Sequence, residues 1–180
     1  TSDSTTWLDR ISVSSFDGGI PIGNLPTGTV ATVASGTVLD LGGGAQSLAG
    51  LGGNGLVTNG TLAVSGMIAP GGTNVIGTLT LANVTPANGT LLIDASVGGT
   101  NDLLKVQGNL NLTGLALQVQ DKNKLKLGTA YVIARCVPGG LTSPFASANL
   151  DAGGLWRVVY DNEKGEVRLE IRRGTLILFD

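Results

Sequence analysis

Short runs in which apolar and polar residues alternate recur along the chain, and they are densest between positions 60 and 121. In the runs TLAV, TLTL and TLLI, which begin at positions 61, 78 and 90, Leu, Val or Ile returns at every second residue. A period of two places these side chains on one face of a β-strand. Gly, Asn or Pro bounds each run, and none continues the apolar spacing of a helix. The pattern predicts an all-β chain of short strands joined by tight turns.

The tripeptide Gly-Thr-Leu or Gly-Thr-Val marks the start of many of these runs. Its spacing is uneven while the chemistry of the following strand stays constant, as expected where strands stack and the connecting turns vary in length. We therefore expect a β-solenoid with a repeat of about 20 residues. The tripeptide begins at Gly28, Gly36, Gly60, Gly77, Gly89 and Gly174.

The chain reads as one continuous domain in three parts. Residues 1–35 form an N-terminal strand and cap segment, in which Pro21 and Pro26 argue against a central strand and Trp7 is a candidate plug for one end of the core. Residues 36–128 form the β-solenoid body. Residues 129–180 form a C-terminal cap and terminal strand, because WRVVYDNEKGEVRLEI reads as an antiparallel hairpin around a turn that ends in Gly165.

Charge is distributed unevenly and limits the classes of partner. Residues 18–93 carry one charged side chain, Asp40, whereas residues 101–180 carry eighteen, and the formal net charge is −2. No basic field for nucleic acid exists overall. No apolar run approaches the length of a membrane-spanning helix, so we expect neither nucleic-acid binding nor membrane insertion. The N-terminus lacks the basic start and apolar run of a signal peptide, so an exported protein would be a mature or excised form.

Candidate chemistry is sparse. The chain has no His and a single Cys, Cys136, which lies in an apolar run and reads as a buried thiol; the alternative is a reactive nucleophile without a His partner. The glycine runs at 42–44 and 50–55 read as turns, because a phosphate loop needs a Lys and a following helix. Asp94 and Asp102 are close in sequence, but the turn between them gives no reason for the carboxyls to converge. We expect no catalytic residue, cofactor or metal.

Residues 68–171 resemble the C-terminal passenger region of bacterial autotransporters and the autotransporter-associated β-strand repeat proteins. The resemblance rests on the ordered series IAPGG, IGTLTL, NGTLLIDA, GGTNDLLKVQGNLNLTG, LKLGTAYVIA, GGLTSPF and WRVVYDNEKGEVRLEI. It implies a right-handed parallel β-helix outside the cell or at the surface of a Gram-negative bacterium, reached after export, with an autochaperone-like cap. The outer-membrane barrel that follows in the family is replaced by RRGTLILFD, so we expect a processed passenger, an excised fragment or a stand-alone relative.

The function expected from this reading is structural. We predict a non-catalytic extracellular solenoid that associates with itself into a fibre or surface layer through its ends and edge strands. An adhesin or display passenger that binds host or glycan surfaces is the alternative. A polysaccharide-degrading β-helix enzyme is the third option, and it would need two carboxylates in one groove. The residues predicted to make the self-association contacts are Trp7, Leu176, Ile177, Leu178 and Phe179.

Overall fold

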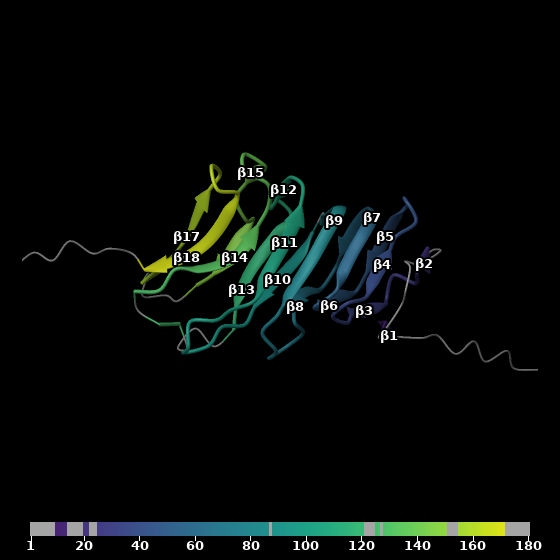
Figure 1. Ribbon diagram of the computed structural model, residues 1–180, viewed down its shortest axis with the longest axis horizontal. Helices are drawn as coiled ribbons and strands as arrows, with labels where there is room; N and C mark the ends of the chain where they lie inside the picture. The colour runs from purple at the N-terminus through teal and green to yellow at the C-terminus, as the bar shows by residue number, and fades with distance from the viewer. Residues whose placement is uncertain are drawn as a thin grey trace, which may run out of the picture.

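The computed structural model describes residues 10–13, 20–21, 25–86, 88–120, 125–126, 128–150 and 155–171. These residues form strands, bridges, turns and bends and contain no helix. The strands lie side by side along the long axis of an elongated body, from β2 at one end to β17 at the other (Figure 1). The all-β class predicted from the alternation is confirmed.

One sheet of the described chain, which we call sheet A, contains seven strands, and every pairing within it is parallel. In spatial order its members are β1 (Arg10–Val13), β3 (Val30–Val33), β6 (Gly50–Gly53), β8 (Met67–Pro70), β10 (Gly89–Ile93), β13 (Leu115–Val119) and β16 (Ser147–Asn149).

A second sheet, sheet B, contains nine strands among the described residues. In spatial order these are β2 (Ile20–Pro21), β4 (Val38–Asp40), β7 (Leu56–Val64), β9 (Thr78–Pro86), β11 (Leu103–Gln107), β14 (Tyr131–Arg135), β18 (Glu166–Ile171) and β17 (Trp156–Asp161), with β5 (Ala45–Leu48) also paired to β7. The pairings are parallel from β2 to β14, whereas β18 is antiparallel to both β14 and β17. A small parallel pair joins β12 (Leu110–Asn111) to β15 (Leu141–Ser143). Pro21 lies in the edge strand of sheet B, where a residue without an N–H is tolerated.

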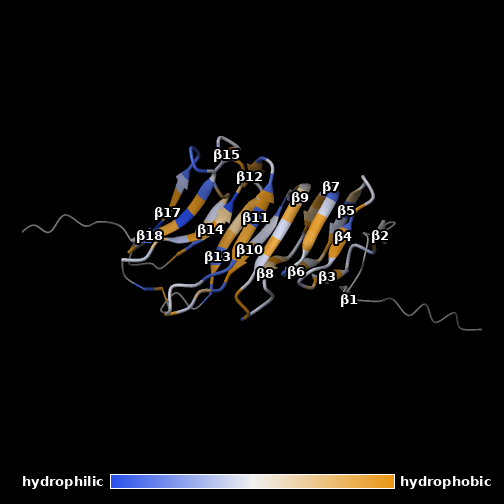
Figure 2. Ribbon diagram, in the orientation of Figure 1, coloured by the Kyte–Doolittle hydropathy of each residue, from blue (hydrophilic) through white to orange (hydrophobic). Residues whose placement is uncertain are grey.

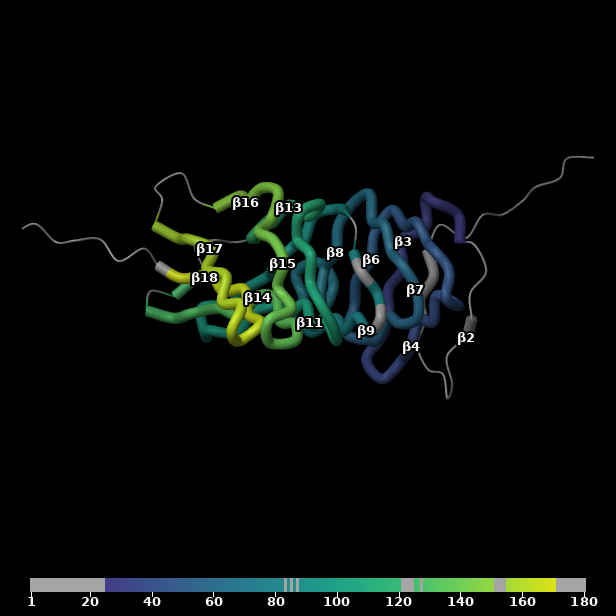
Figure 3. The backbone as a smooth tube through the Cα atoms, turned by 90° about the horizontal axis from the view of Figure 1, so that it is seen from above, coloured from purple at the N-terminus to yellow at the C-terminus, as the bar shows by residue number. Residues whose placement is uncertain are grey.

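The chain passes alternately through the two sheets, and we call one passage through both a round. Each strand pairs with the strand one round earlier, and the residues in register are 17 apart for Leu51 and Ile68 but 31 apart for Leu117 and Ala148. The predicted spacing of about 20 residues therefore holds only in the N-terminal rounds. Later rounds are longer because their bends are longer. This path is compatible with a β-solenoid. Figure 3 shows β13 and β16 of sheet A on one side of the body and β14 of sheet B on the other.

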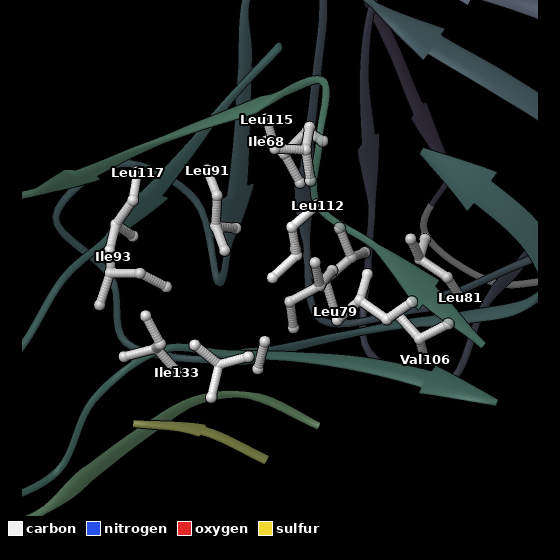
Figure 4. Packing of buried hydrophobic residues seen from close by; sticks show 14 of the residues in the cluster. Ile68, Leu79, Leu81, Leu91, Ile93, Val106, Leu112, Leu115, Leu117 and Ile133 are labelled. Atoms are coloured by element: carbon white, nitrogen blue, oxygen red, sulfur yellow. The ribbon is translucent and has the colours of Figure 1, made fainter. Parts of the chain in front are cut away.

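The core fills the space between the sheets with aliphatic side chains stacked in register. In sheet A one column runs from strand to strand through Ala31, Leu51, Ile68, Leu91 and Leu117, all at most 2% exposed. The side chains of the two sheets point toward one another in Figure 4. Stacking in register buries each member of the column against its neighbours above and below, which contributes on the order of 2 kcal/mol per Leu or Ile. The facing column of sheet B consists of Leu39, Val57, Leu81 and Val106.

One glycine-rich stretch does not form the turn predicted for it. Residues Gly50–Gly53 form strand β6 in the middle of sheet A, and all four are buried. Leu51 supplies the inward side chain, while Gly53 has a φ of +105° and passes so close to the backbone of Val33 that a Cβ there would overlap it. The turn prediction was wrong because backbone packing against a neighbouring strand needs glycine as much as a turn does.

Sheet B extends one strand beyond sheet A at the C-terminal end. β18 lies beside β14 as β16 lies beside β13, and β17 then adds a further strand that has no counterpart in the described part of sheet A. Two antiparallel pairings in succession restore the original direction, so β17 runs parallel to the body strands. Hydrophilic residues cluster on β17, β18 and the turn between them (Figure 2).

Candidate functional site: a buried aspartate at a bend between the sheets

The described residue whose ionisation is most strongly perturbed lies at the bend from β10 in sheet A to β11 in sheet B. This bend comprises residues 94–102, and it is held as a narrow loop by a single antiparallel bridge between Ala95 and Asn101. The backbone N–H of Asp102 donates to the carbonyl of Asp94 (2.9 Å), and that of Ser96 donates to the carbonyl of Thr100 (2.8 Å). The bend therefore begins and ends with an aspartate, and the loop closure brings the two together.

Asp102 is fully buried and both of its carboxyl oxygens accept backbone hydrogen bonds. Oδ2 accepts from the N–H of Asp94 at 2.8 Å, within the same bend. Oδ1 accepts from the N–H of Gly77 at 2.8 Å, at the corresponding bend one round earlier. The side chain thus accepts hydrogen bonds from two amides that the strand ladders leave unpaired. Buried backbone amides need such partners. It also ties one round of the chain to the next.

Two amide side chains extend this connection along the same edge of the body. Asn54 Oδ1 accepts from the N–H of Thr78 at 2.8 Å, and Asn101 Nδ2 donates to the carbonyl of Val132 at 2.7 Å. We call Asn54, Asn101 and Asp102 the corner bracket. Together they link the bends that precede β7, β9, β11 and β14, so four successive rounds are joined by side chains as well as by strand pairing.

Gly77 is needed where the corner bracket is most crowded. A Cβ built on Gly77 would overlap Asn54 Oδ1 and would come within 2.6 Å of the Cα of Gly71. Only a residue without a side chain lets the backbone pass close enough to donate to Asp102. The glycine of the Gly-Thr-Leu tripeptide at this position therefore allows close packing between rounds, in addition to preceding a strand.

Burial makes the carboxyl of Asp102 a weaker acid than usual. Removal from water raises the pKa of its carboxyl from 3.8 to about 7, although the hydrogen bonds from Asp94 and Gly77 act in the opposite direction, and the neighbouring Asp94 charge raises it further. Asp94 is itself 7% exposed, and its Oδ2 is buried without a hydrogen-bond partner. Burial and the nearby Asp94 charge therefore favour the protonated form of the Asp102 carboxyl up to near-neutral pH.

The bend brings the Asp102 carboxyl to the backbone N–H of Asp94, a contact that nothing in the sequence predicted. The physical reason is the bridge between Ala95 and Asn101, which closes the bend. The pair nevertheless lacks the features of a hydrolytic site, because Asp102 is 0% exposed and both of its oxygens are occupied by backbone amides. Within the described ranges, no three Cys, Asp or Glu side chains gather closely enough to hold a metal ion.

The other residues singled out by sequence have varied outcomes. Cys136 is buried, its Sγ–H donates to the carbonyl of Val137 at 3.4 Å, and burial raises the thiol pKa above its usual value, so the thiolate that reacts as a nucleophile is disfavoured. Trp7 and the segment 176–179, which includes Leu176, Ile177, Leu178 and Phe179, lie outside the described residues.

The hairpin of β17 and β18 carries a cluster of ion pairs on its surface. Arg168 is central to it: its guanidinium lies 3.0 Å from Asp161, 3.3 Å from Glu166 and 3.0 Å from Glu170. Arg135 of β14 adds a contact of 2.7 Å to Glu166. The backbone N–H of Lys164, with help from Arg168 and Lys164 charge, holds the pKa of Asp161 below its usual value. The last strands of sheet B are therefore covered by charge, which discourages pairing with another sheet edge.

No protein-family model matches the chain, and no curated protein matches its sequence. No helix long and apolar enough to cross a membrane occurs in the described part of the chain.

The corner bracket was missed by sequence reasoning, apart from Asp102. Asn54 and Asn101 each stand next to a glycine or threonine in a bend, a context that turn chemistry alone explains. Their position in the sequence could have identified these two residues, because each lies two residues before the start of a sheet B strand. A side chain placed there in every round lies along one edge of the stacked sheets.

Proposed function

We propose that the chain is a right-handed parallel β-solenoid with a C-terminal hairpin cap. We propose further that it serves as a non-catalytic structural element outside the cell or on the surface of a Gram-negative bacterium, where it associates with itself through its ends. The extracellular setting and the handedness rest on the resemblance of residues 68–171 to autotransporter passengers.

The solenoid proposal is supported by the path of the chain. Strands alternate between sheets A and B, each in parallel register with the strand one round earlier, and the inward side chains stack into continuous aliphatic columns. Such a column has no natural end, so each terminal round must be covered by something other than a further round. At the C-terminal end, β18 and β17 extend sheet B by two antiparallel strands with charged side chains, and in this proposal they form the cap.

One observation carries the self-association proposal: sheet A stops one strand short of sheet B. Its last described strand, β16, comprises Ser147, Ala148 and Asn149, all exposed and all uncharged. In the described chain sheet A has no strand beyond β16, and β16 lacks the charges that protect β17 and β18. A strand supplied by another copy would complete sheet A at this level.

The terminal segment is the strand that we propose to fill this place. Nine residues follow Ile171, and Leu176–Phe179 is an uncharged apolar run long enough for a short strand. In the proposed assembly this run of one copy pairs with β16 of its neighbour. Extension by end-to-end contacts would give a fibre.

The proposal is tested by separating the terminal strand from the edge that receives it. Sedimentation velocity and negative-stain electron microscopy compare the full chain with a chain lacking residues 174–180, with Ala148→Lys and with the control Ala148→Ser. We expect filaments or discrete oligomers for the full chain and the Ser variant, and monomers for the deletion and the Lys variant, because a charge on β16 opposes edge pairing.

Two results would overturn the proposal. One is a full chain that stays monomeric at all accessible concentrations. The other is assembly that persists unchanged in both the deletion and Ala148→Lys, since neither the segment nor the edge would then take part. Circular dichroism of each variant distinguishes loss of assembly from loss of folding.

A further inference from the structure

An uncharged groove of about 390 Å³ crosses the outer face of sheet A over strands β3, β6 and β8. Its floor is Gly50 and Gly52, which alternate along β6 with the inward-facing Leu51. Its walls are Val30 and Met67, and the loop that follows β8 adds the side chain of Val75. This face of the sheet would ordinarily carry polar residues, as the alternation of a half-buried strand requires.

The apolar walls of the groove are unusually open to solvent. Val30 is 42% exposed, Met67 46% and Val75 54%, and all three line the same hollow. The glycine floor makes the hollow, because a Cβ at Gly50 would fill the space between Val30 and Met67, lying 3.3 Å from Val30 Cγ1 and 3.5 Å from the Met67 carbonyl. Exposed apolar side chains that converge on a hollow of this kind mark a place where another group packs.

We infer that the groove is the docking site of the N-terminal segment of the same chain, with the side chain of Trp7 as its occupant. The argument begins with strand register. Arg10 of β1 pairs with Val30 of β3, and Val30 pairs with Gly50 of β6, so the first residue of β1 lies two strands from the centre of the groove. Neighbouring strands are about 4.8 Å apart, which makes that separation on the order of 10 Å.

The length of chain before Arg10 matches this separation. Trp7 precedes Arg10 by three residues, and three residues of extended chain span about 10 Å. An extended segment that crosses the face of the sheet from Arg10 is therefore long enough to carry the indole of Trp7 to the row formed by Val30, Gly50 and Met67. A segment from the opposite end of the same molecule has no such access, because the termini of the described chain lie at opposite ends of the body (Figure 1).

The chemistry of the groove selects the same occupant. None of its lining residues is charged, and only Thr32 and Thr73 bring side-chain hydroxyl groups. Charged ligands therefore find no partner there, whereas a flat apolar ring gains contact with the glycine floor and leaves its N–H at the rim, as buried tryptophans require. Trp7 is the only tryptophan besides Trp156, which is in the core of the opposite end.

The inference is tested by the fluorescence of Trp7 alone, in a Trp156→Phe background. Emission wavelength and acrylamide quenching are measured for this protein, for the same protein with Val30→Lys, and for a control with Val97→Lys. Val97 is 70% exposed in the bend between β10 and β11 and does not line the groove. If Trp156→Phe does not fold, the difference spectrum between the wild-type chain and Trp7→Ser reports the same signal.

We expect the emission of Trp7 to be blue-shifted and its quenching several-fold weaker than that of free tryptophan. Val30→Lys should shift the emission to the red and restore quenching several-fold, while Val97→Lys leaves both unchanged. Quenching equal to that of free tryptophan in the parent protein, or no response to Val30→Lys, overturns the inference. Loss of protection on dilution, in step with dissociation of oligomers, also overturns it, because the occupant would then come from a second copy. Measurement at concentrations where the chain is monomeric keeps this result independent of the proposed assembly.

Discussion

Replacing Asp102 with Asn should change how the stability of the protein depends on pH, and not only how large that stability is. Asp102 accepts hydrogen bonds from the amides of Gly77 and Asp94. Asn offers one oxygen and turns an NH₂ group toward the second amide. One buried N–H then loses its acceptor, which costs about 1–3 kcal/mol. Asp102→Ala orphans both amides and should cost roughly twice as much.

The pH dependence comes from the raised pKa of Asp102. In the unfolded chain the carboxyl titrates near its usual 3.8, whereas in the folded protein it titrates near about 7. Between these values the folded state holds a proton that the unfolded state has released, so stability falls as pH rises. The contribution is fully present below about pH 4 and lost above about pH 7, and its size is roughly 4 kcal/mol. Asp102→Asn does not titrate and lacks this slope.

The measurement is urea unfolding of the wild type and Asp102→Asn from about pH 4 to about pH 8, read as the difference in unfolding free energy between the two. We expect the wild type to be the more stable at low pH and the difference to shrink or reverse by the upper limit. Asp161→Asn is the matched control. The pKa of Asp161 is lowered below its usual 3.8, so the wild-type advantage over that variant is nearly complete at about pH 4 and should stay almost constant up to about pH 8.

A difference between wild type and Asp102→Asn that is constant across this range would refute the reasoning. A difference that grows with pH would refute it more specifically. It would mean that the two amide hydrogen bonds outweigh burial and hold Asp102 ionised, with a pKa below its usual value.

Three further variants test other contacts. Gly77→Ala should destabilise the protein by about 2–3 kcal/mol because its methyl overlaps Asn54, while Gly28→Ala, which has no atom within 4 Å of the added methyl, should change stability little in the same urea titration. Arg168→Gln should lower stability by about 1 kcal/mol, and by less in high salt, since it removes partly exposed ion pairs on the hairpin. Tyr131→Phe should cost about 1 kcal/mol in thermal unfolding followed by circular dichroism, because the part-buried hydrogen bond from the N–H of Lys126 to the Tyr131 hydroxyl, 2.7 Å long, is lost.

The class of fold could be predicted from sequence because alternation is a local property. Leu79 and Leu81 reveal their strand and its inward face without reference to any other segment, and both are fully buried. The length of each round could not be predicted in the same way. The bends set it, and a bend such as residues 94–102 closes through hydrogen bonds that depend on its own geometry.

Glycine can form a turn or allow close packing of two backbones, and these two roles look alike in the sequence around β6. A glycine such as Gly36, with a φ of +77°, makes a turn, whereas Gly52 lies in a strand and leaves room for the neighbouring Ala69 carbonyl, 3.1 Å from where a Cβ would be. The distinction depends on what lies one round away. The groove on sheet A was invisible for the same reason, since Val30 and Met67 are 37 positions apart and meet only through register.

The corner bracket explains why an ionisable residue is buried in a body that otherwise avoids charge. Two rounds earlier, Asn54 meets a single backbone amide, that of Thr78, and its exposed position leaves the NH₂ group to water. At the longer bend two amides, those of Gly77 and Asp94, point at one side chain from opposite directions, in a place without solvent. Only a carboxyl offers two acceptor oxygens there, since an amide would turn a donor toward one of the donors. The elevated pKa of Asp102 follows from this geometry. The bend needs two acceptor oxygens, and burial makes the negative charge of the carboxylate that supplies them costly above neutral pH.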